Sequence, residues 1–269
     1  MRLALPLIAA LSLLPSRGIA GEPRAVLCVD AGHGGRQPGA IGPHQELEKQ
    51  ISLEVAARLT VALEKAFDAK VVMTRSTDEE VDLDDRVKVA NEARADVFVS
   101  VHCNSMPTGQ TRKRVQGVET YFLSAEPTGE QARRVAAREN AEAKKAGKPK
   151  GDALSLILND LAKTEAHQDA SRLAYAVHQR VVKDLGATDR GVHQAYFVVL
   201  SGASMPAILL EMGFISNEAE AKLLSDSKYQ QKIADSVVAG IASFFEQTGR
   251  KELVRKIATV APEAAPAPR

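Results

Sequence analysis

Residues 26–48, VLCVDAGHGGRQPGAIGPHQELE, decide the fold and carry the first reactive groups of the chain. Residues 26–29 are a short, valine-rich apolar run, which is typical of a central strand covered on both faces. Glycines then surround His33 and permit a tight turn, so this imidazole follows the carboxyl end of a strand, where open α/β sheets place their sites. Glu48 stands at the start of a helical pattern. His33 and Glu48 are therefore candidate functional residues.

Two later stretches repeat this arrangement of an apolar run followed by a polar side chain. Residues 96–101 (DVFVSV) lead to His102, and residues 206–210 (PAILL) lead to Glu211. If the three strands run parallel, His33, His102 and Glu211 emerge along one rim of a sheet. Two imidazoles and two carboxylates would then converge there.

A catalytic zinc ion requires such a set. Three protein ligands of the His, His and Glu kind leave a fourth position for water, and a further carboxylate can take the proton of that water. The four residues are far apart in the sequence and lack the short spacing of an HExxH helix. The inference therefore depends on where the strands end, since no local pattern supports it.

The rest of the chain predicts one α/β domain. Its fold would be a twisted, mostly parallel central sheet of about six strands flanked by helices. Apolar runs predict further strands at residues 70–74, 117–124 and 196–200. Helical periodicity marks residues 51–67, 81–95, 154–161, 173–185 and 229–245, and a short helix begins near residue 217.

Composition and the termini set further expectations. A net charge of +1 without tryptophan gives no electrostatic footprint for nucleic acid and no stacking platform.

Residues 1–20 have the pattern of a secretory signal, and no later apolar run approaches membrane length. Residues 250–269 are expected to be a disordered Pro/Ala-rich tail. The location would be periplasmic or secreted. Cys28 and Cys103 could form a bridge, but two buried thiols are favoured.

Five segments in order carry a resemblance to a known family. They are DAGHGGRQPGAIG, ELEKQISLEVAARL, SVHCNS, RGVHQAYFVVL and PAILLEMGFISN. These resemble the successive motifs of the zinc-dependent N-acetylmuramoyl-L-alanine amidases of bacterial cell-wall turnover, the amidase_3 family. The resemblance spans roughly residues 24–246, places a catalytic domain at residues 24–248 and implies a phosphorylase/hydrolase-like fold.

The resemblance implies a function and a site. The reaction would be hydrolysis of the amide bond between N-acetylmuramic acid and L-alanine in peptidoglycan, which releases stem peptides in cell-wall remodelling or daughter-cell separation. His33, Glu48 and His102 would hold one zinc ion per chain, and Glu211 would be the catalytic carboxylate. Glu46 is a rival for Glu48, but Glu48 precedes a lysine and opens the helical run, as the acidic ligand of the family does.

Residues 126–185 would form a helical insertion within this domain. In some relatives that act in cell division, an acidic side chain from such an insertion reaches the metal until an activator protein displaces the helix. Glu126, Glu130 and Glu139 lie in the corresponding region, and Glu130 is the residue predicted to act as the autoinhibitory ligand. The alternatives are a solvated charged face and helices that only cover the sheet.

Several other residues and two other functions stay open. Arg75 and Arg86 resemble basic residues near the site of the family, Asn104 could orient His102 or bind substrate, and His44 lies in the loop before Glu48. Structural roles are favoured for His167, His178 and His193.

A zinc carboxypeptidase or other peptidase could use the same four residues but would release free amino acids. A wall-binding pseudoenzyme would usually lack a ligand, and all four residues are present.

Overall fold

A six-stranded sheet forms the centre of the computed structural model, which describes residues 24–107, 109–143 and 165–255. The strands lie in the order β2-β1-β3-β6-β4-β5. Strands β2, β1, β3 and β6 are parallel, while β4 pairs antiparallel with β6 and parallel with β5. Their bounds are β1 (Ala25–Ala31), β2 (Ala69–Met73), β3 (Val97–Asn104), β4 (Val118–Leu123), β5 (Asp189–Ala195) and β6 (Ala207–Phe214). The expectation of a mostly parallel sheet is confirmed.

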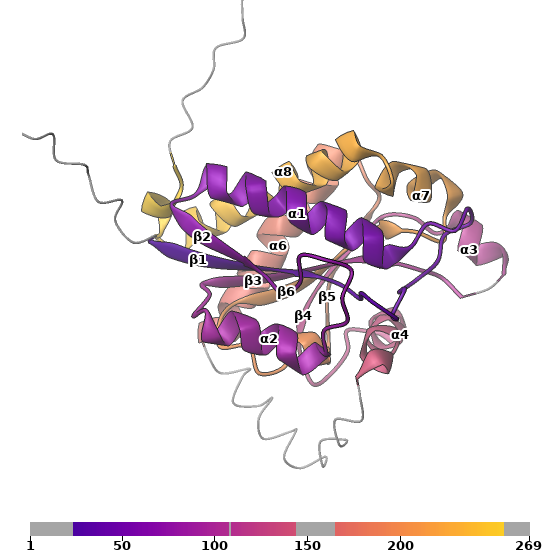
Figure 1. Ribbon diagram of the computed structural model, residues 1–269, viewed down its shortest axis with the longest axis horizontal. Helices are drawn as coiled ribbons and strands as arrows, with labels where there is room; N and C mark the ends of the chain where they lie inside the picture. Colours follow the sequence, from indigo (N-terminus) through magenta and orange to yellow (C-terminus); the bar gives the residue numbers. More distant parts are fainter. Residues whose placement is uncertain (1–23, 108, 144–164, 256–269) are drawn as a thin grey trace, which may run out of the picture.

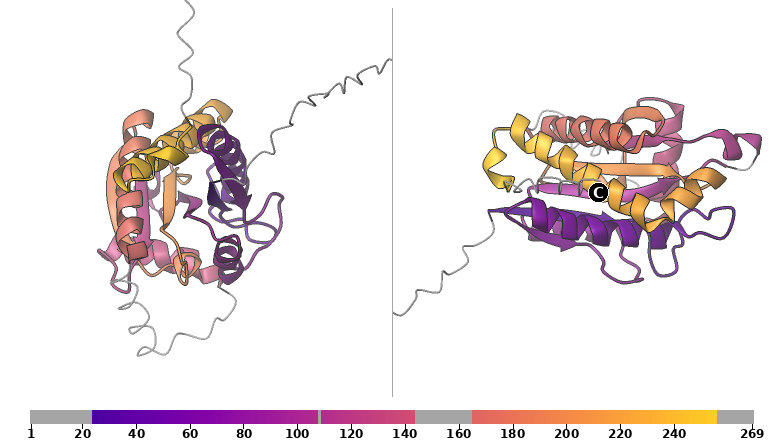
Figure 2. Two further views of the ribbon diagram at one scale, coloured as in Figure 1. Left: turned by 90° about the vertical axis from the view of Figure 1, so that its left-hand side faces the viewer. Right: turned by 90° about the horizontal axis from the view of Figure 1, so that it is seen from above.

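Helices cover both faces of this sheet (Figures 1 and 2). Their bounds are α1 (Glu48–Ala66), α2 (Leu83–Glu92), α3 (Gln110–Arg114), α4 (Glu130–Glu139), α6 (Glu165–Leu185), α7 (Glu218–Leu224) and α8 (Ser227–Gln247), with 3-10 turns η1 (Asn140–Glu142), η2 (Val198–Leu200) and η3 (Lys251–Leu253). Helices α1, α6 and α8 lie on one face and α2 on the other, while α4 lies at the end toward which β1, β3 and β6 run.

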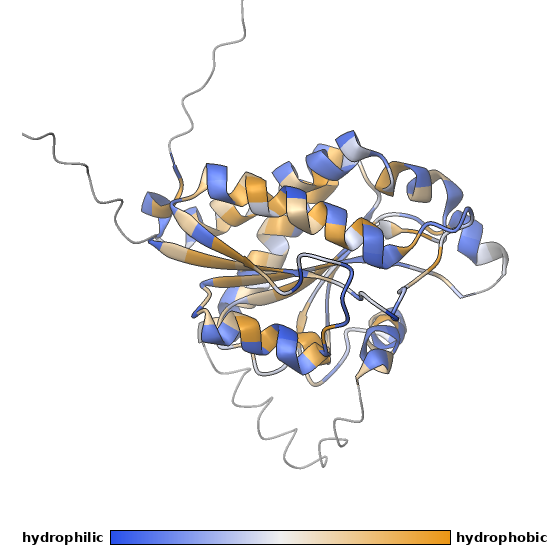
Figure 3. Cartoon of the chain, in the orientation of Figure 1, coloured by the Kyte–Doolittle hydropathy of each residue, from blue (hydrophilic) through white to orange (hydrophobic). Residues whose placement is uncertain are grey.

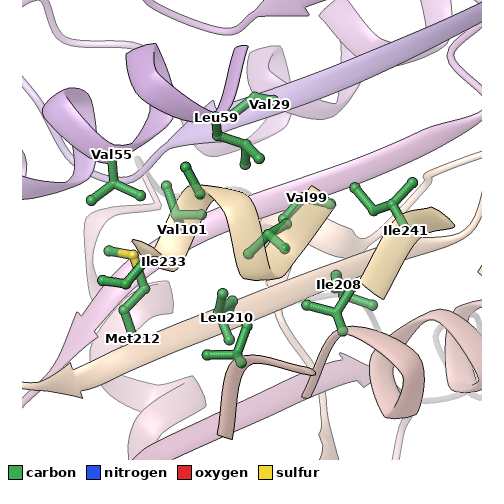
Figure 4. Packing of buried hydrophobic residues seen from close by; sticks show 14 of the residues in the cluster. Val29, Val55, Leu59, Val99, Val101, Ile208, Leu210, Met212, Ile233 and Ile241 are labelled. Atoms are coloured by element: carbon green, nitrogen blue, oxygen red, sulfur yellow. The ribbon is translucent and has the colours of Figure 1, made fainter. Parts of the chain in front are cut away.

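The apolar side chains divide between the two faces because successive residues of a strand point in opposite directions. Val29, Val99 and Leu210 face the layer of α1, α6 and α8, where they pack with residues such as Leu59 and Ile233 (Figure 4). The second apolar cluster lies under α2, α4 and η2. Hydropathy colouring shows the apolar strands between helices whose outer faces are hydrophilic (Figure 3). Both faces of the sheet are therefore buried.

The pleat also decides where the reactive side chains go. In β3, Val99, Val101 and Cys103 join the cluster beneath α1 and α8, so His102 is left to the opposite face. Register then brings His102 directly beside Glu211 of β6. Cys103 and Cys28 are both buried free thiols, as favoured from the sequence.

One predicted strand is wrong. The apolar run at residues 196–200 was expected to be a strand, but β5 ends at Ala195 and η2 begins at Val198. Strand β5 is an edge strand of partly exposed residues, so it has no continuous apolar run, while the residues of η2 pack into the core below the sheet. The apolar signal therefore marked a buried turn.

Some expectations fall outside the described residues. These include the signal segment at residues 1–20, residues 144–164 of the insertion and residues 256–269 of the tail. The expectation that the disordered tail begins at residue 250 is wrong, because η3 spans Lys251–Leu253, Leu253 is buried and Val254 pairs with Phe67. Within the part of the chain that the structure describes, no helix combines the length and apolar character needed to cross a membrane.

Candidate metal centre

The loop after β1 holds His33 in a left-handed backbone conformation, with φ of 59°. Two buried arginines stabilise this strained turn through backbone carbonyls. Arg75 donates from Nε to Ala31 O (2.8 Å) and from Nη2 to Gly32 O (2.8 Å), and Arg86 donates from Nη2 to His33 O (2.7 Å). Both arginines are at most 2% exposed, so they orient the loop and do not face a substrate.

A fully buried carboxylate anchors one of these arginines. Asp30 accepts from Arg86 Nη1 at 2.8 Å, from Ser100 Oγ at 2.6 Å and from Thr74 Oγ1 at 2.6 Å. Burial alone would raise the pKa of Asp30, but Arg86 and the two hydroxyl donors hold it below its usual value. The His33 loop is thus tied to the centre of the sheet by an ion pair.

Four buried side chains bring one ligand atom each to a common centre. Glu48 Oε1 lies 3.0 Å from His33 Nε2 and 3.1 Å from His102 Nδ1. Glu139 Oε2 lies 3.4 Å from His33 Nε2 and 3.0 Å from His102 Nδ1. All four atoms lie within 4.8 Å of one another, and each residue is at most 5% exposed. His33, Glu48 and His102 are the residues predicted from the sequence, and the structure brings them together.

The four His–Glu separations of 3.0–3.4 Å fit ligand atoms around one metal ion. Ligands at 2.0–2.2 Å from an ion in tetrahedral geometry lie about 3.4 Å from one another. His33 Nε2 and Glu139 Oε2 are buried without a hydrogen-bond partner among the described residues. Such atoms are costly to bury unless something else binds them, and a metal ion does so.

Outer contacts orient the ligands. His33 Nδ1 lies 2.8 Å from Glu142 Oε1, and a proton donated there leaves the lone pair of Nε2 directed at the centre. Glu48 accepts backbone N–H groups from Ala40 (2.7 Å, at Oε2) and Cys103 (2.8 Å, at Oε1). Glu46, the sequence rival of Glu48, accepts from the backbone N–H of His44 instead and lies outside the cluster.

The cluster is electrostatically suited to a cation. Burial alone would lower the pKa of His102, but Glu139 and Glu48 raise it to about 9. Burial and the nearby Glu139 would raise the pKa of Glu48, yet His33 and His102 hold it at about 2. The carboxylates of Glu48 and Glu139 thus favour a positive charge between them, which a divalent ion can supply in place of protons.

Glu211 lies beside His102 but is not part of the four-residue cluster. Its Oε1 accepts from Arg138 Nη2 at 2.9 Å, and its Oε2 is buried without a hydrogen-bond partner among the described residues. Burial raises its pKa to about 8 despite Arg138, with Glu139 and Glu48 adding to the rise. A carboxylate of raised pKa next to a metal position can exchange protons with a reacting group.

The insertion reaches this site with a different residue from the one predicted. Glu130 opens α4, is largely exposed and pairs with Arg134 Nε at 3.1 Å, so its prediction as a ligand is wrong. Glu139 is nine residues later, about 13 Å along the helix. A sequence signal existed, because Ala132, Val135, Ala136 and Glu139 form the buried stripe of α4 and Glu130 is not on it.

A cavity of about 780 Å³ adjoins the cluster. It runs between residues 38–41, residues 105–107 and α4, and Arg112 lines it as well. Arg112 donates to Ile41 O (2.7 Å) and Met106 O (3.1 Å), so it ties the two loop walls together. This cavity offers the space for a substrate next to His33 and Glu48.

The remaining histidines lie apart from the centre. His44 is exposed and 3.5 Å from Glu218. His178 is buried between Thr120 and Asp189, His193 contacts Arg190 O, and His167 packs on Phe122. The structural roles expected for the last three agree with these contacts.

Comparisons with known proteins agree on one family. The family model described as N-acetylmuramoyl-L-alanine amidase matches residues 27–243. The chain is 34% identical over 235 residues to the N-acetylmuramoyl-L-alanine amidase AmiC of Escherichia coli O6:H1, covering 86% of this chain and 55% of AmiC. It is 33% identical over 227 residues to AmiA of Escherichia coli K12, covering 82% of this chain and 76% of AmiA. The chain thus spans about half the length of AmiC and three quarters of AmiA.

Solved structures show the same fold. The catalytic domain of CwlV, an N-acetylmuramoyl-L-alanine amidase from Bacillus (Paenibacillus) polymyxa, is similar with a TM-score of 0.62 and 29% identity, covering 82% of this chain and 98% of that domain. An N-acetylmuramoyl-L-alanine amidase from Clostridium difficile 630 is similar with a TM-score of 0.64 and 28% identity, covering 84% of this chain and 100% of that one. The chain therefore belongs to the N-acetylmuramoyl-L-alanine amidase family, the cell-wall hydrolases that the motifs at His33, His102 and Glu211 resemble.

Proposed function

We propose that this chain hydrolyses the amide bond between N-acetylmuramic acid and L-alanine in peptidoglycan, with one zinc ion, and releases stem peptides. The observation that carries the proposal is the convergence of four buried ligand atoms beside the buried carboxylate of Glu211. We take this substrate from the description of the family and from the names of the relatives AmiC and AmiA, all of which read N-acetylmuramoyl-L-alanine amidase.

His33, Glu48 and His102 would hold the ion. When bound, zinc supplies a Lewis acid that polarises the scissile carbonyl and lowers the pKa of water toward about 7. Glu211 takes a proton from the attacking water at Oε2, the oxygen that has no hydrogen-bond partner among the described residues. It then delivers this proton to the leaving nitrogen, and its raised pKa makes the protonated form accessible.

We further propose that the structure represents a self-inhibited state. With His33, Glu48 and His102 holding the ion, Glu139 would be a fourth ligand in place of an incoming water or carbonyl, and its neighbour Arg138 pairs with Glu211 at 2.9 Å. One end of α4 therefore covers both the metal position and the proposed base. An activator protein would have to move α4 before peptidoglycan can bind.

The test of self-inhibition uses two opposite readouts. Glu139→Ala should raise basal hydrolysis at saturating zinc and lower zinc affinity, since it opens a coordination position and removes a ligand. Glu130→Ala is the matched control, because Glu130 is exposed on the same helix, and it should change neither quantity. If Glu139→Ala abolishes both hydrolysis and zinc binding, Glu139 is a permanent zinc ligand and α4 does not inhibit the enzyme.

The cellular setting is also proposed. Export to the periplasm or the exterior would bring the chain to its substrate, and the pattern of residues 1–20 supports it. N-terminal sequencing of the exported chain should find Gly21 first; retention of Met1 would contradict cleavage. A role in daughter-cell separation predicts chains of unseparated cells when the gene is deleted, and normally separated cells would contradict it.

The reaction itself is tested by mass spectrometry of products from purified peptidoglycan. The exported chain is assayed as prepared, after treatment with a chelator, and after zinc is titrated back. We expect intact stem peptides that begin with L-alanine, lost with the chelator and restored by zinc. Release of free terminal amino acids would identify a peptidase instead. To separate self-inhibition from inactivity, Glu139→Ala is assayed in parallel.

A further inference from the structure

We propose that Asn104 Oδ1 and the backbone carbonyl of Ser105 form an acceptor site for the leaving nitrogen of the scissile amide, and that Glu119 positions Asn104 for this task. The inference rests on the proposed function. In the self-inhibited state, the guanidinium of Arg138 donates hydrogen bonds to these same two oxygens.

The contacts of Arg138 reveal the site. Its Nη1 donates to Asn104 Oδ1 and to Ser105 O, both at 2.9 Å, and its Nη2 donates to Glu211 Oε1 at 2.9 Å. Its Nε donates to Glu139 Oε1 at 2.6 Å. When α4 moves away, three oxygens remain that face the same space, and two of them, Asn104 Oδ1 and Ser105 O, can only accept hydrogen bonds. Such a site selects a nitrogen that carries hydrogens.

A hydrogen bond to the buried carboxylate of Glu119 sets the orientation of the Asn104 amide. Asn104 Nδ2 donates to Glu119 Oε2 at 2.5 Å, and that carboxylate also accepts from Tyr121 Oη (2.7 Å) and Arg190 Nε (2.7 Å). Because a carboxylate only accepts, and already accepts from Tyr121 and Arg190 among the described residues, Asn104 turns its NH₂ group toward Glu119 and its oxygen toward the site. The backbone N–H of Ser105 supports the same oxygen at 2.8 Å.

The sheet places these groups next to the proposed proton donor. Glu119 of β4 lies opposite Glu211 of β6 in the antiparallel ladder. Asn104 follows His102 by two residues in β3, so the two side chains share a face. Asn104, Glu119 and Glu211 are all 0% exposed. The fixed acceptors therefore lie where the nitrogen must receive its proton.

The chemistry of the reaction explains why acceptors are useful here. Water oxygen adds to the carbonyl carbon, and the C–N bond then breaks with its electron pair left on nitrogen. Nitrogen takes up the proton that Glu211 had received from water, so one N–H group becomes at least two. Its hydrogens become stronger donors as positive charge develops. Oxygens already aimed at them stabilise the transition state more than the planar amide.

The kinetic test compares an amide with an ester. The protein is the full chain with zinc in an R138A/E139A background, which frees the acceptors. The substrates are an N-acetylmuramoyl-L-alanyl peptide and its analogue in which L-lactate replaces L-alanine, so that oxygen replaces the scissile nitrogen. Asn104→Ala should lower kcat/KM for the amide on the order of 10- to 100-fold and for the ester by less than about threefold. Equal losses on both substrates would overturn the proposal.

A second variant tests the positioning role. Glu119→Gln keeps the volume but can offer its own NH₂, which removes the preference for one Asn104 orientation. It should also lower kcat/KM for the amide more than for the ester, and an equal loss would remove Glu119 from this role. Glu211→Gln is the contrast, because loss of the proton carrier affects both substrates. If the R138A/E139A parent cleaves neither substrate, the proposed function itself fails.

Binding gives a readout that does not depend on turnover. Methylguanidinium carries the donors of the Arg138 side chain and serves as the probe. In the R138A/E139A protein, it should cause a saturable NMR shift of the Ser105 backbone amide, whose partner is Asn104 Oδ1. Glu119→Gln should weaken this binding at least about tenfold. A parent protein that shows no saturable shift would contradict the acceptor site.

Discussion

At the scale of the residue, Glu211 and His102 are neighbours in register with different expected roles. Glu211→Gln keeps the shape of the side chain but cannot take a proton, so we expect kcat to fall about 10²- to 10⁴-fold while zinc content stays at one ion per chain. His102→Ala should lose both zinc and hydrolysis. Metal analysis beside kinetics distinguishes the two variants, and zinc loss in Glu211→Gln would make Glu211 a ligand.

Asp30 gives a second prediction at this scale, on stability. Because Arg86 holds the pKa of Asp30 below its usual value in the fold, the ion pair contributes fully above the unfolded pKa of about 3.9 and is lost as pH falls below it. Asp30→Asn leaves Arg86 buried without its charge partner. We expect the free energy of unfolding at pH 7 to fall by about 3–5 kcal/mol.

Urea denaturation at pH 7 and at pH 3 checks this prediction. The difference between wild type and Asp30→Asn should shrink at the lower pH, since Asp30 of the unfolded chain takes up a proton below its ordinary pKa while the folded carboxylate, whose pKa is lowered, keeps its charge longer. Asp235→Asn is the control, because Asp235 is exposed on α8 and bonds only Gln231 in the described residues; we expect a change within about 0.5 kcal/mol. A pH-independent difference would mean that the ion pair is not its cause.

At the scale of the element, the loop from β1 to α1 depends on arginines that come from elsewhere in the chain. Arg75 bonds the carbonyls of Ala31 and Gly32, and its Nη2 also reaches Lys49 O at 2.7 Å, next to Glu48. A Cβ at Gly32 would lie 2.4 Å from His102 Cε1, so the loop passes very close to the second imidazole. Small shifts of this loop should therefore disturb the ligand set.

Arg75→Lys tests that dependence. A lysine cannot satisfy three carbonyls with one planar group, so we expect zinc affinity to fall about 10- to 100-fold, as is usual when an outer partner of a ligand is lost. Competition with a zinc-sensitive dye measures the affinity. Arg36→Lys is the matched control, since Arg36 is 85% exposed and pairs with Glu80 on the loop surface. Equal affinities for Arg75→Lys and wild type would refute the role of Arg75.

At the scale of the whole molecule, the layer that backs the sheet depends on close contact between α6 and α8. A Cβ at Gly240 of α8 would lie 2.5 Å from Val177 Cα of α6, and backbone cannot move aside as a side chain can. Alanine would favour the isolated helix by about 1 kcal/mol, but overpacking typically costs about 1–3 kcal/mol. We expect the clash to dominate because it meets backbone.

Gly240→Ala should therefore lower the midpoint of urea unfolding. Zinc affinity should not change, because α6 and α8 cover the face of the sheet opposite to His102. A rise in the midpoint would show that the two helices can separate slightly at no cost. A loss of zinc affinity would show instead that the packing of this layer is coupled to the site.

The rim of the site follows from the places where three apolar strands end. Strands 26–29, 96–101 and 206–210 were recognised by their apolar runs, and the residues that follow them, His33, His102 and Glu211, do meet at one rim. This succeeded because a buried parallel strand needs a continuous apolar run and because its carboxyl end has a defined place. Glu48 was likewise marked by the start of α1.

The sequence by itself determined the central apolar strands and the rim where His33, His102 and Glu211 lie, since a buried parallel strand appears as a short apolar run. The resemblance to the family supplied the ligand roles. Only the tertiary structure decided that Glu139 completes the cluster, that Arg138 covers Glu211, and that Glu119 turns the oxygen of Asn104 to the site. These contacts join residues that are distant in sequence or on the opposite end of a helix. Their partners are chosen by how α4 and β4 pack on the rim, which no local pattern encodes.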